Sequence, residues 1–136
     1  MPNSALDVKP AVHLLLDYLE QEGVEYIFGI PGGPIMPLYE ALYDRGRIKP
    51  VLAKHEEGAA FMADGYARAS GKIGVCCTTT GPGATNALTG LAVSYADSVP
   101  VLLLTAQVPT HQFGMGAFQE SSPETLDLVA LFRPVT

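Results

Sequence analysis

The sequence predicts a doubly wound α/β fold, with a mainly parallel β-sheet and helices on both of its faces. Three observations favour this class. Short apolar runs alternate with longer segments of helical periodicity. Successive runs are separated by helices long enough for right-handed parallel crossovers. The run 73–80, "IGVCCTTT", starts as a continuously apolar segment, as a strand buried on both faces should. At 136 residues, the chain is expected to form one domain with its own core.

The first part of the chain supplies two predicted helices and the start of the sheet. Apolar residues recur at helical spacing over residues 7–22 and stop at a glycine, which predicts the first helix. The β-branched and aromatic run 24–30, "VEYIFGI", is the first strand. "PGGP" at 31–34 forces a turn. Its last proline can open a second helix over 35–45, because a first-turn proline lacks only an N–H that would have no partner.

The middle of the chain repeats this alternation. The predicted elements are a strand at 49–54, an alanine-rich helix at 56–70, the strand at 73–80, a helix at 81–98 behind a glycine turn, and a strand at 99–107. One face of the helix 56–70 carries Ala59, Ala60, Ala63 and Ala67, which permits close packing against a neighbouring helix or subunit.

The last part of the chain is predicted to begin with a loop, residues 108–123, that holds at most a short helix. A helix over 124–132 follows, and "RPVT" at 133–136 resembles the first residues of a strand. We therefore expect residues 1–136 to be a single, truncated domain that is a piece of a longer architecture.

Composition excludes several classes of function. The net charge of −6 leaves no basic surface for nucleic acid. The longest apolar stretch, 99–108, is about half the length needed to span a bilayer. Asp7 and Lys9 interrupt the N-terminal region, so no signal peptide is expected. Cys76 and Cys77 are sequence neighbours that cannot easily pair, so buried reduced thiols and a cytoplasmic setting are expected.

Ligands of doubly wound sheets bind at the carboxyl ends of the strands, where the unusual residues of this sequence collect. Four segments lie at that edge: "GIPGGP" (29–34), "KHEEG" (54–58), "TTTGPGATN" (78–86) and "TAQVPTHQFGMGAFQE" (105–120). The glycine loop 78–86 is neither a dinucleotide motif nor a P-loop. Taken alone, it favours a structural tight turn over a ligand-facing loop, and both interpretations stay open. No metal ligands are predicted, since His13, His55 and His111 lack the spacing of a metal site.

Two adjacent carboxylates, Glu56 and Glu57, begin the alanine-rich helix. The helix dipole favours acidic residues in a first turn, so both can simply stabilise the helix end. Successive side chains leave a helix about 100° apart, so one can also cap while the other faces the ligand edge.

The combination of these segments resembles a known family. "FGIPGGPIMPLYEAL", "KHEEGAAFMADGYARASGK", "TTTGPGATNALTGLAVSYADSVPVLLLTAQVP" and "GAFQE" together are similar to the pyrimidine-binding domain of thiamine-diphosphate-dependent enzymes, and most of all to the acetolactate synthase (acetohydroxyacid synthase) group. The resemblance runs from about residue 10 to the end of the chain.

The resemblance implies a catalytic role for Glu56. In this family the carboxylate after the His of the "HE" pair contacts N1′ of the cofactor's aminopyrimidine. That contact favours the imino form of the 4′-amino group, which removes the proton from thiazolium C2. We therefore expect Glu56 to be desolvated and Glu57 to keep the capping role.

The resemblance implies further site residues. Gly33 matches a position where some decarboxylase relatives carry a Ser or acidic side chain, so its bare backbone fits a carboligating synthase better. Phe118 and Gln119 match residues on the substrate side. The implied cofactor-binding set is Pro31, Gly32, Gly33, Glu56, Thr80 and Gly81.

The family's other parts do not occur in this sequence. They are a "GDG" segment with a later Asn, which hold Mg²⁺ and the diphosphate, and a middle domain associated with FAD. The resemblance implies thiamine diphosphate as cofactor, Mg²⁺ held by the missing domain, and allows FAD in the full-length enzyme. The partner is the diphosphate-binding domain of a neighbouring subunit in a homo-oligomer, so the isolated chain is expected to be inactive.

The implied function is decarboxylation of pyruvate and transfer of the two-carbon unit to a second 2-oxo acid. Two alternatives stay open: a thiamine-diphosphate-dependent decarboxylase or lyase of another 2-oxo acid, and a non-catalytic α/β assembly module. Glu56 favours the enzyme, since an assembly module has no need of a carboxylate there.

Overall fold

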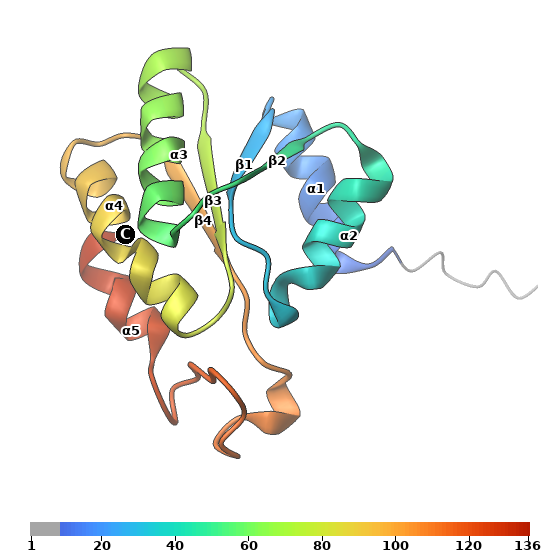
Figure 1. Cartoon of the computed structure of the whole chain (residues 1–136), viewed down its shortest axis with the longest axis vertical. Helices are drawn as coiled ribbons and strands as arrows, with labels where there is room; N and C mark the ends of the chain where they lie inside the picture. Colours follow the sequence, from blue (N-terminus) through green and yellow to red (C-terminus); the bar gives the residue numbers. More distant parts are fainter. Residues whose placement is uncertain (1–8) are drawn as a thin grey trace, which may run out of the picture.

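The computed structural model describes residues 9–136 and shows a parallel β-sheet between two layers of helices (Figure 1). The strands are β1 (Tyr26–Gly29), β2 (Lys49–Leu52), β3 (Gly74–Thr78) and β4 (Val101–Thr105). The helices are α1 (Ala11–Gln21), α2 (Met36–Arg45), α3 (Glu56–Ser70), α4 (Pro82–Ala96) and α5 (Leu128–Phe132). All pairings are parallel, in the order β2-β1-β3-β4. The predicted doubly wound α/β class is confirmed.

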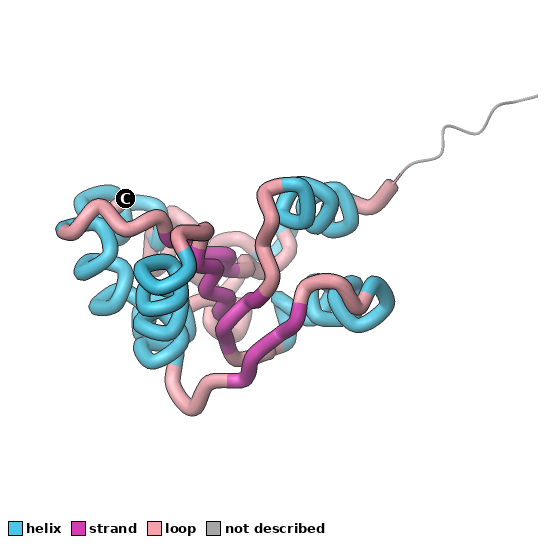
Figure 2. The backbone as a smooth tube through the Cα atoms, turned by 90° about the horizontal axis from the view of Figure 1, so that it is seen from above, coloured by secondary structure: helices cyan, strands magenta, loops and turns pink. Residues whose placement is uncertain are grey.

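The two helical layers divide the core. Helices α1 and α2 cover one face of the sheet, and α3, α4 and α5 cover the other (Figures 1 and 2). Successive residues of a strand point to opposite faces. Cys77 accordingly packs with the α1–α2 layer, and Cys76 with the α3–α4 layer. Every residue of β3 is buried, which explains its continuously apolar start.

Helices α3 and α4 pack closely because small residues line their contact. A Cβ added at Gly90 would lie 2.6 Å from the Cβ of Ala60. All the alanines of the predicted face are buried: Ala59, Ala60, Ala63 and Ala67. This face therefore meets a neighbouring helix and the sheet of the same chain, one of the two partners that the sequence allowed.

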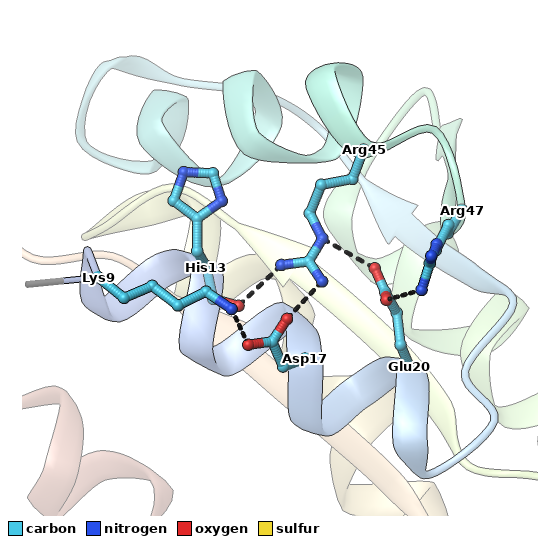
Figure 3. Close-up of polar contacts among 6 residues, drawn as sticks. All are labelled: Lys9, His13, Asp17, Glu20, Arg45 and Arg47. Carbon is cyan, nitrogen blue, oxygen red and sulfur yellow. Dashed lines mark hydrogen bonds and ion pairs between the residues drawn. The ribbon is translucent and has the colours of Figure 1, made fainter. Parts of the chain in front are cut away.

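An ion-pair network holds α1 against α2 on the opposite layer. Arg45, at the end of α2, donates from Nε to Oε1 of Glu20 (2.9 Å), from Nη1 to the carbonyl oxygen of His13 (2.9 Å) and from Nη2 to Asp17. Figure 3 shows its members: Lys9, His13, Asp17, Glu20, Arg45 and Arg47. The start of the first helix, predicted at residue 7, lies outside the described residues; the helix itself begins at Ala11.

The C-terminal part corrects two predictions. The helix predicted over 124–132 is only α5, which begins after Asp127, whose carboxylate accepts a hydrogen bond from the backbone N–H of Ala130 (2.9 Å). The strand predicted at 133–136 is wrong: Arg133–Val135 form a 3-10 turn that continues directly from α5. Pro134, which has no backbone N–H to donate, stands in this 3-10 turn, where the regular α-helix has already ended.

The strand order fixes where a ligand site can lie. From β1 the chain turns outward through α2 to β2, and from β3 it turns the opposite way through α4 to β4. The loops that leave the carboxyl ends of β1 and β3 therefore separate, and such a switch point is the usual binding place in doubly wound sheets. No helix within residues 9–136 is long and apolar enough to cross a membrane.

Candidate functional site

The loops after β1 and β3 touch at the switch point. A Cβ at Gly32 would lie 2.7 Å from Oγ1 of Thr79, so only glycine fits there without rearrangement. Pro31 and Gly33 are exposed, and a Cβ at Gly33 would meet nothing within 4 Å. Of the three glycine-turn residues predicted for the site, Gly32 thus forms the loop contact, while Pro31 and Gly33 face open space.

Glu56 is the first residue of α3 and reaches toward the N-terminal turns of α4. Its Oε2 accepts a hydrogen bond from Nδ2 of Asn86 (3.0 Å). Its Oε1 lies 3.5 Å from the position that a Cβ on Gly83 would take. The side chain is half-buried, so the expected desolvation of Glu56 is partial in this chain.

The cap of α3 is made by His55 instead of Glu57. His55 precedes the helix with extended backbone, and its Nδ1 accepts a hydrogen bond from the backbone N–H of Glu57 (3.2 Å). Glu57 is already inside the first helical turn, where its charge suits the helix dipole but its side chain is not the cap. The capping role predicted for Glu57 therefore belongs to His55.

A neutral thiol lies close to Glu56. Burial raises the pKa of Cys76 to about 12, and the nearby Cys77 and the Glu56 carboxylate add to the effect. Burial also raises the pKa of Cys77 to about 12. Both cysteines are buried free thiols, as expected from the sequence, and neither supplies a thiolate near neutral pH.

Thr80 and Gly81 belong to a buried polar cluster that joins three loops. Thr80 is fully buried, and its Oγ1 is hydrogen-bonded to Oγ of Ser121. Ser121 Oγ also accepts from the backbone N–H of Gly81 (3.3 Å) and from Nε2 of Gln107 (3.2 Å). The Thr80 hydroxyl is thus engaged inside the cluster by Ser121.

Gln119 is held beside Gly81. Gly81 has a left-handed φ of 60°, and a Cβ there would lie 2.8 Å from the carbonyl oxygen of Gln119. Gln119 itself has a φ of 59°, which is rare for a residue with a side chain. The structure therefore brings together two predicted site residues that lie far apart in the sequence.

Phe118 and Gly33 share an open hollow beside this cluster. Phe118 is 86% exposed. The hollow is lined by Gly33, Pro34, Pro37, Gln107, Val108, Pro109, Gln112, Ala117 and Phe118. Glu56 is not part of this lining, so the carboxylate and the predicted substrate-side residue Phe118 occupy different parts of the sheet edge.

Sequence reasoning missed four polar residues of this region: Asn86, Gln107, Glu120 and Ser121. Glu120 is buried, and its Oε1 accepts hydrogen bonds from the backbone N–H of Gly114 and from Oγ of Ser122, both 2.5 Å. These donors, Ser122 first, hold the pKa of Glu120 below its usual value. Their position in the sequence could have indicated them, because all four residues lie in the segments that follow the carboxyl ends of β3 and β4.

The site fits the uncharged end of the expected cofactor but not its charged end. The carboxylate of Glu56, an acceptor at the carboxyl edge of the sheet, suits a ring nitrogen of an aminopyrimidine. Of the four segments at this edge, 29–34, 54–58, 78–86 and 105–120, only 54–58 carries a lysine, Lys54, and none carries an arginine, which is little positive charge to hold a diphosphate. Among the described residues, no three His, Cys, Asp or Glu side chains are grouped as a metal site requires.

Comparison with known proteins identifies the family of this chain. The family described as "Thiamine pyrophosphate enzyme, N-terminal TPP binding domain" matches residues 10–130. The chain is 53% identical over 122 residues to the probable acetolactate synthase large subunit of Methanocaldococcus jannaschii, covering 90% of this chain and 20% of that protein. It is 51% identical over 124 residues to the acetolactate synthase of Arthrospira platensis, covering 89% of this chain and 21% of that protein.

A third relative is the acetolactate synthase large subunit of Lactococcus lactis, 50% identical over 123 residues, with 90% of this chain and 20% of that protein covered. The chain thus spans about a fifth of the length of the curated relatives it matches. A family match over most of the chain, a doubly wound parallel sheet and a carboxylate at the start of α3 agree with one another. The chain therefore belongs to the thiamine pyrophosphate enzymes, as a member of their N-terminal TPP binding domain family.

Proposed function

We propose that this chain supplies the pyrimidine-binding half of the active site of an acetolactate synthase. The complete enzyme would decarboxylate pyruvate and transfer the two-carbon unit to a second 2-oxo acid. The observation that carries the proposal is Glu56, which places a half-buried carboxylate at the start of α3, beside the switch point of the sheet. The names of the relatives favour this activity over others of the family.

Each predicted site residue has a defined role in this proposal. Glu56 binds the aminopyrimidine ring nitrogen and exchanges a proton with it. Gly32, through its contact with Thr79, and Gly81, through its contact with Gln119, hold the loops around the ring. Pro31, Gly33 and the Thr80 backbone border the cofactor, and Phe118 and Gln119 border the substrate. The bound thiamine diphosphate supplies the nucleophilic carbon and the electron sink for decarboxylation.

The other half of the site comes from outside the chain. We propose that a diphosphate-binding domain of a neighbouring subunit holds the diphosphate and Mg²⁺, in a homo-oligomer, and that FAD belongs to the complete enzyme only. The four site segments hold one lysine, Lys54, and no arginine, and this scarcity of positive charge supports the division. On this view, residues 1–136 are one domain of a longer cytoplasmic enzyme, and the chain alone has no turnover.

The test is reconstitution with a diphosphate-binding domain. We expect weak or absent binding of thiamine diphosphate and Mg²⁺ to the chain alone, measured by calorimetry, and activity only in the assembled complex. Glu56→Gln should abolish that activity and leave assembly intact, as measured by sedimentation. Activity that survives in E56Q would overturn the catalytic role and favour an assembly module.

Product analysis separates the synthase from the decarboxylase or lyase. The assembled enzyme is supplied with pyruvate alone and with pyruvate plus 2-oxobutyrate. A synthase forms joined acetohydroxy acids in both cases, whereas a decarboxylase releases free aldehyde. Gly33 favours the synthase, since its exposed position carries no side chain that could deliver a proton to the two-carbon unit.

A further inference from the structure

Asn86 is placed to control the two oxygens of Glu56 separately. It lies one turn into α4, and its Nδ2 donates a hydrogen bond to Oε2 of Glu56 (3.0 Å). The close packing of α3 on α4, where Gly90 meets Ala60, fixes the two helices against each other. The second oxygen, Oε1, has a different neighbour: it lies 3.5 Å from the position that a Cβ on Gly83 would take, and no hydrogen bond to Oε1 is formed among the described residues.

From this arrangement we propose that Asn86 is a positioning residue that makes Oε1 the proton-carrying oxygen of Glu56. The inference rests on the proposed role of Glu56 and goes beyond it, because it assigns the proton to one oxygen and names the residue responsible. Oε2 serves as a permanent acceptor for Asn86, and Oε1 alone exchanges a proton with the ring nitrogen.

The physical reason is the chemistry of the amide. The Nδ2 group of asparagine only donates, so the oxygen that it contacts must accept. In a neutral carboxyl group the carbonyl oxygen is a better acceptor than the hydroxyl oxygen. A donor fixed on Oε2 therefore favours the form in which Oε2 is the carbonyl and Oε1 carries the proton. With the cofactor bound, Oε1 would give up its proton to the ring nitrogen and would take it back in the reverse step, while Oε2 keeps its hydrogen bond from Asn86.

The titratable neighbours of Glu56 do not account for a pH-dependent change at the Asn86–Glu56 pair. Cys76, on β3, stays neutral through the relevant pH range, since its pKa is raised to about 12 by burial and nearby groups. His55 and Glu57 flank Glu56 in the chain, and the His55 ring is engaged by the backbone N–H of Glu57. A Glu56→Gln variant keeps all three groups, so any signal that it loses belongs to Glu56.

The test uses nuclear magnetic resonance on the chain itself, with the Asn86 side-chain amide and the Glu56 carboxyl carbon as probes. We expect both to shift with the same pH midpoint, and the amide inflection to be lost in Glu56→Gln. Asn86→Ala removes the donor and should move the Glu56 midpoint to higher pH, and Asn86→Asp, which adds a like charge, should move it further. Thr89→Ala, one turn along the exposed side of α4, is the matched control and should leave the midpoint in place.

Spectra recorded at low pH show which oxygen of Glu56 carries the proton. If Oε1 carries it, the hydrogen bond from Asn86 to Oε2 persists, and the amide signals stay distinct from those of Glu56→Ala, where the acceptor is missing. If Oε2 carries it, the bond breaks and the two sets of signals coincide, which would overturn the proposal. An unchanged midpoint in both Asn86 variants would overturn it as well.

The outcome is independent of the proposed function. Full activity of E56Q in the assembled enzyme would reject the catalytic role of Glu56, yet the titration of the chain would still show whether Asn86 selects the oxygen. Conversely, an inactive E56Q enzyme with no coupling between Asn86 and Glu56 would retain the function and reject the positioning role.

Discussion

Gly81 and Gln119 meet so closely that a Cβ on Gly81 would lie 2.8 Å from the carbonyl oxygen of Gln119. Gly81 also has a left-handed φ of 60°. The glycine loop after β3 and the loop after β4 are therefore locked together at the edge of the sheet. A contact of this kind fixes where Gln119 and its neighbour Phe118 can lie.

Gly81→Ala should destabilise the chain by about 1–3 kcal/mol, because the new Cβ adds both a clash and backbone strain. Urea unfolding followed by circular dichroism measures the change. Gly33→Ala is the matched control for stability, since a Cβ there meets nothing within 4 Å. Equal stability of the two variants would mean that the loops are not locked as described.

Ser121→Ala should destabilise the chain by about 1–3 kcal/mol, because it leaves the buried N–H of Gly81 without its acceptor and removes a hydrogen bond from Thr80 and from Gln107. Ser121 Oγ serves Thr80, the backbone N–H of Gly81 and the Gln107 amide. Thermal unfolding tests this expectation. Thr89→Ala, at an exposed position, should change stability by less than about 0.5 kcal/mol. If Ser121→Ala changed stability as little as the control does, Ser121 would not be the shared hydrogen-bond partner that holds these groups together.

Asp64 should make stability depend on pH in the acid range. It is buried, receives hydrogen bonds from Arg68 Nε (2.6 Å) and Ser94 Oγ (2.8 Å), and links α3 to α4. Arg68 first, and Ser94 second, hold the pKa of Asp64 below its usual value of 3.8, against the opposing effect of burial.

The pKa of Asp64 is lower in the folded chain than in the unfolded chain. Its contribution to stability is therefore complete at pH values above the unfolded-state pKa, and it is lost as the pH falls through the folded-state pKa. The free energy of unfolding of the native chain should therefore decrease as the pH is lowered below 3.8. Asp64→Asn should weaken this pH dependence. Urea titrations at neutral pH and at progressively lower pH measure it. An identical acid dependence in the native chain and in the variant would exclude Asp64 as a source.

Arg45→Gln should loosen α1 from α2, with an effect that shrinks at high salt, because salt still screens partly buried ion pairs, although less than fully exposed ones. Arg45 contacts Asp17, Glu20 and the backbone of His13. Arg47→Gln is the matched control, since Arg47 is 77% exposed and makes one ion pair, to Glu20. The measurement is the hydrogen-exchange rate of the α1 amides in the two variants, at low and at high salt. Equal exchange in the two variants at low salt would refute the role of Arg45.

Much of the fold was predictable because local signals agree with one another. Helix α3 has the predicted bounds, with extended His55 before it and left-handed Gly71 after it. Strand β3 shows its burial directly in its apolar residues. The last residues were misjudged because "RPVT" is too short for strand and turn to differ in pattern, and the preceding helix decided the outcome.

The site was predictable only in part. Glu56 was found through its place at a helix start and through the family resemblance. Asn86 and Ser121 were missed because their partners are distant in the sequence: Asn86 meets Glu56 30 residues away, and Ser121 meets Gly81 40 residues away. Nothing in the residues around either of them indicates such a contact.

The sequence by itself determined the alternation of strands and helices, the parallel sheet, and the edge at which the loops and the carboxylate gather. These follow from the spacing of apolar residues and from glycines and prolines, which act on the chain locally. Only the tertiary structure decided that Asn86 holds one oxygen of Glu56, that His55 caps α3, and that Thr80 turns its hydroxyl to Ser121. Side-chain partners depend on which helices and loops the packing brings within hydrogen-bond distance, and that is set by the whole chain at once.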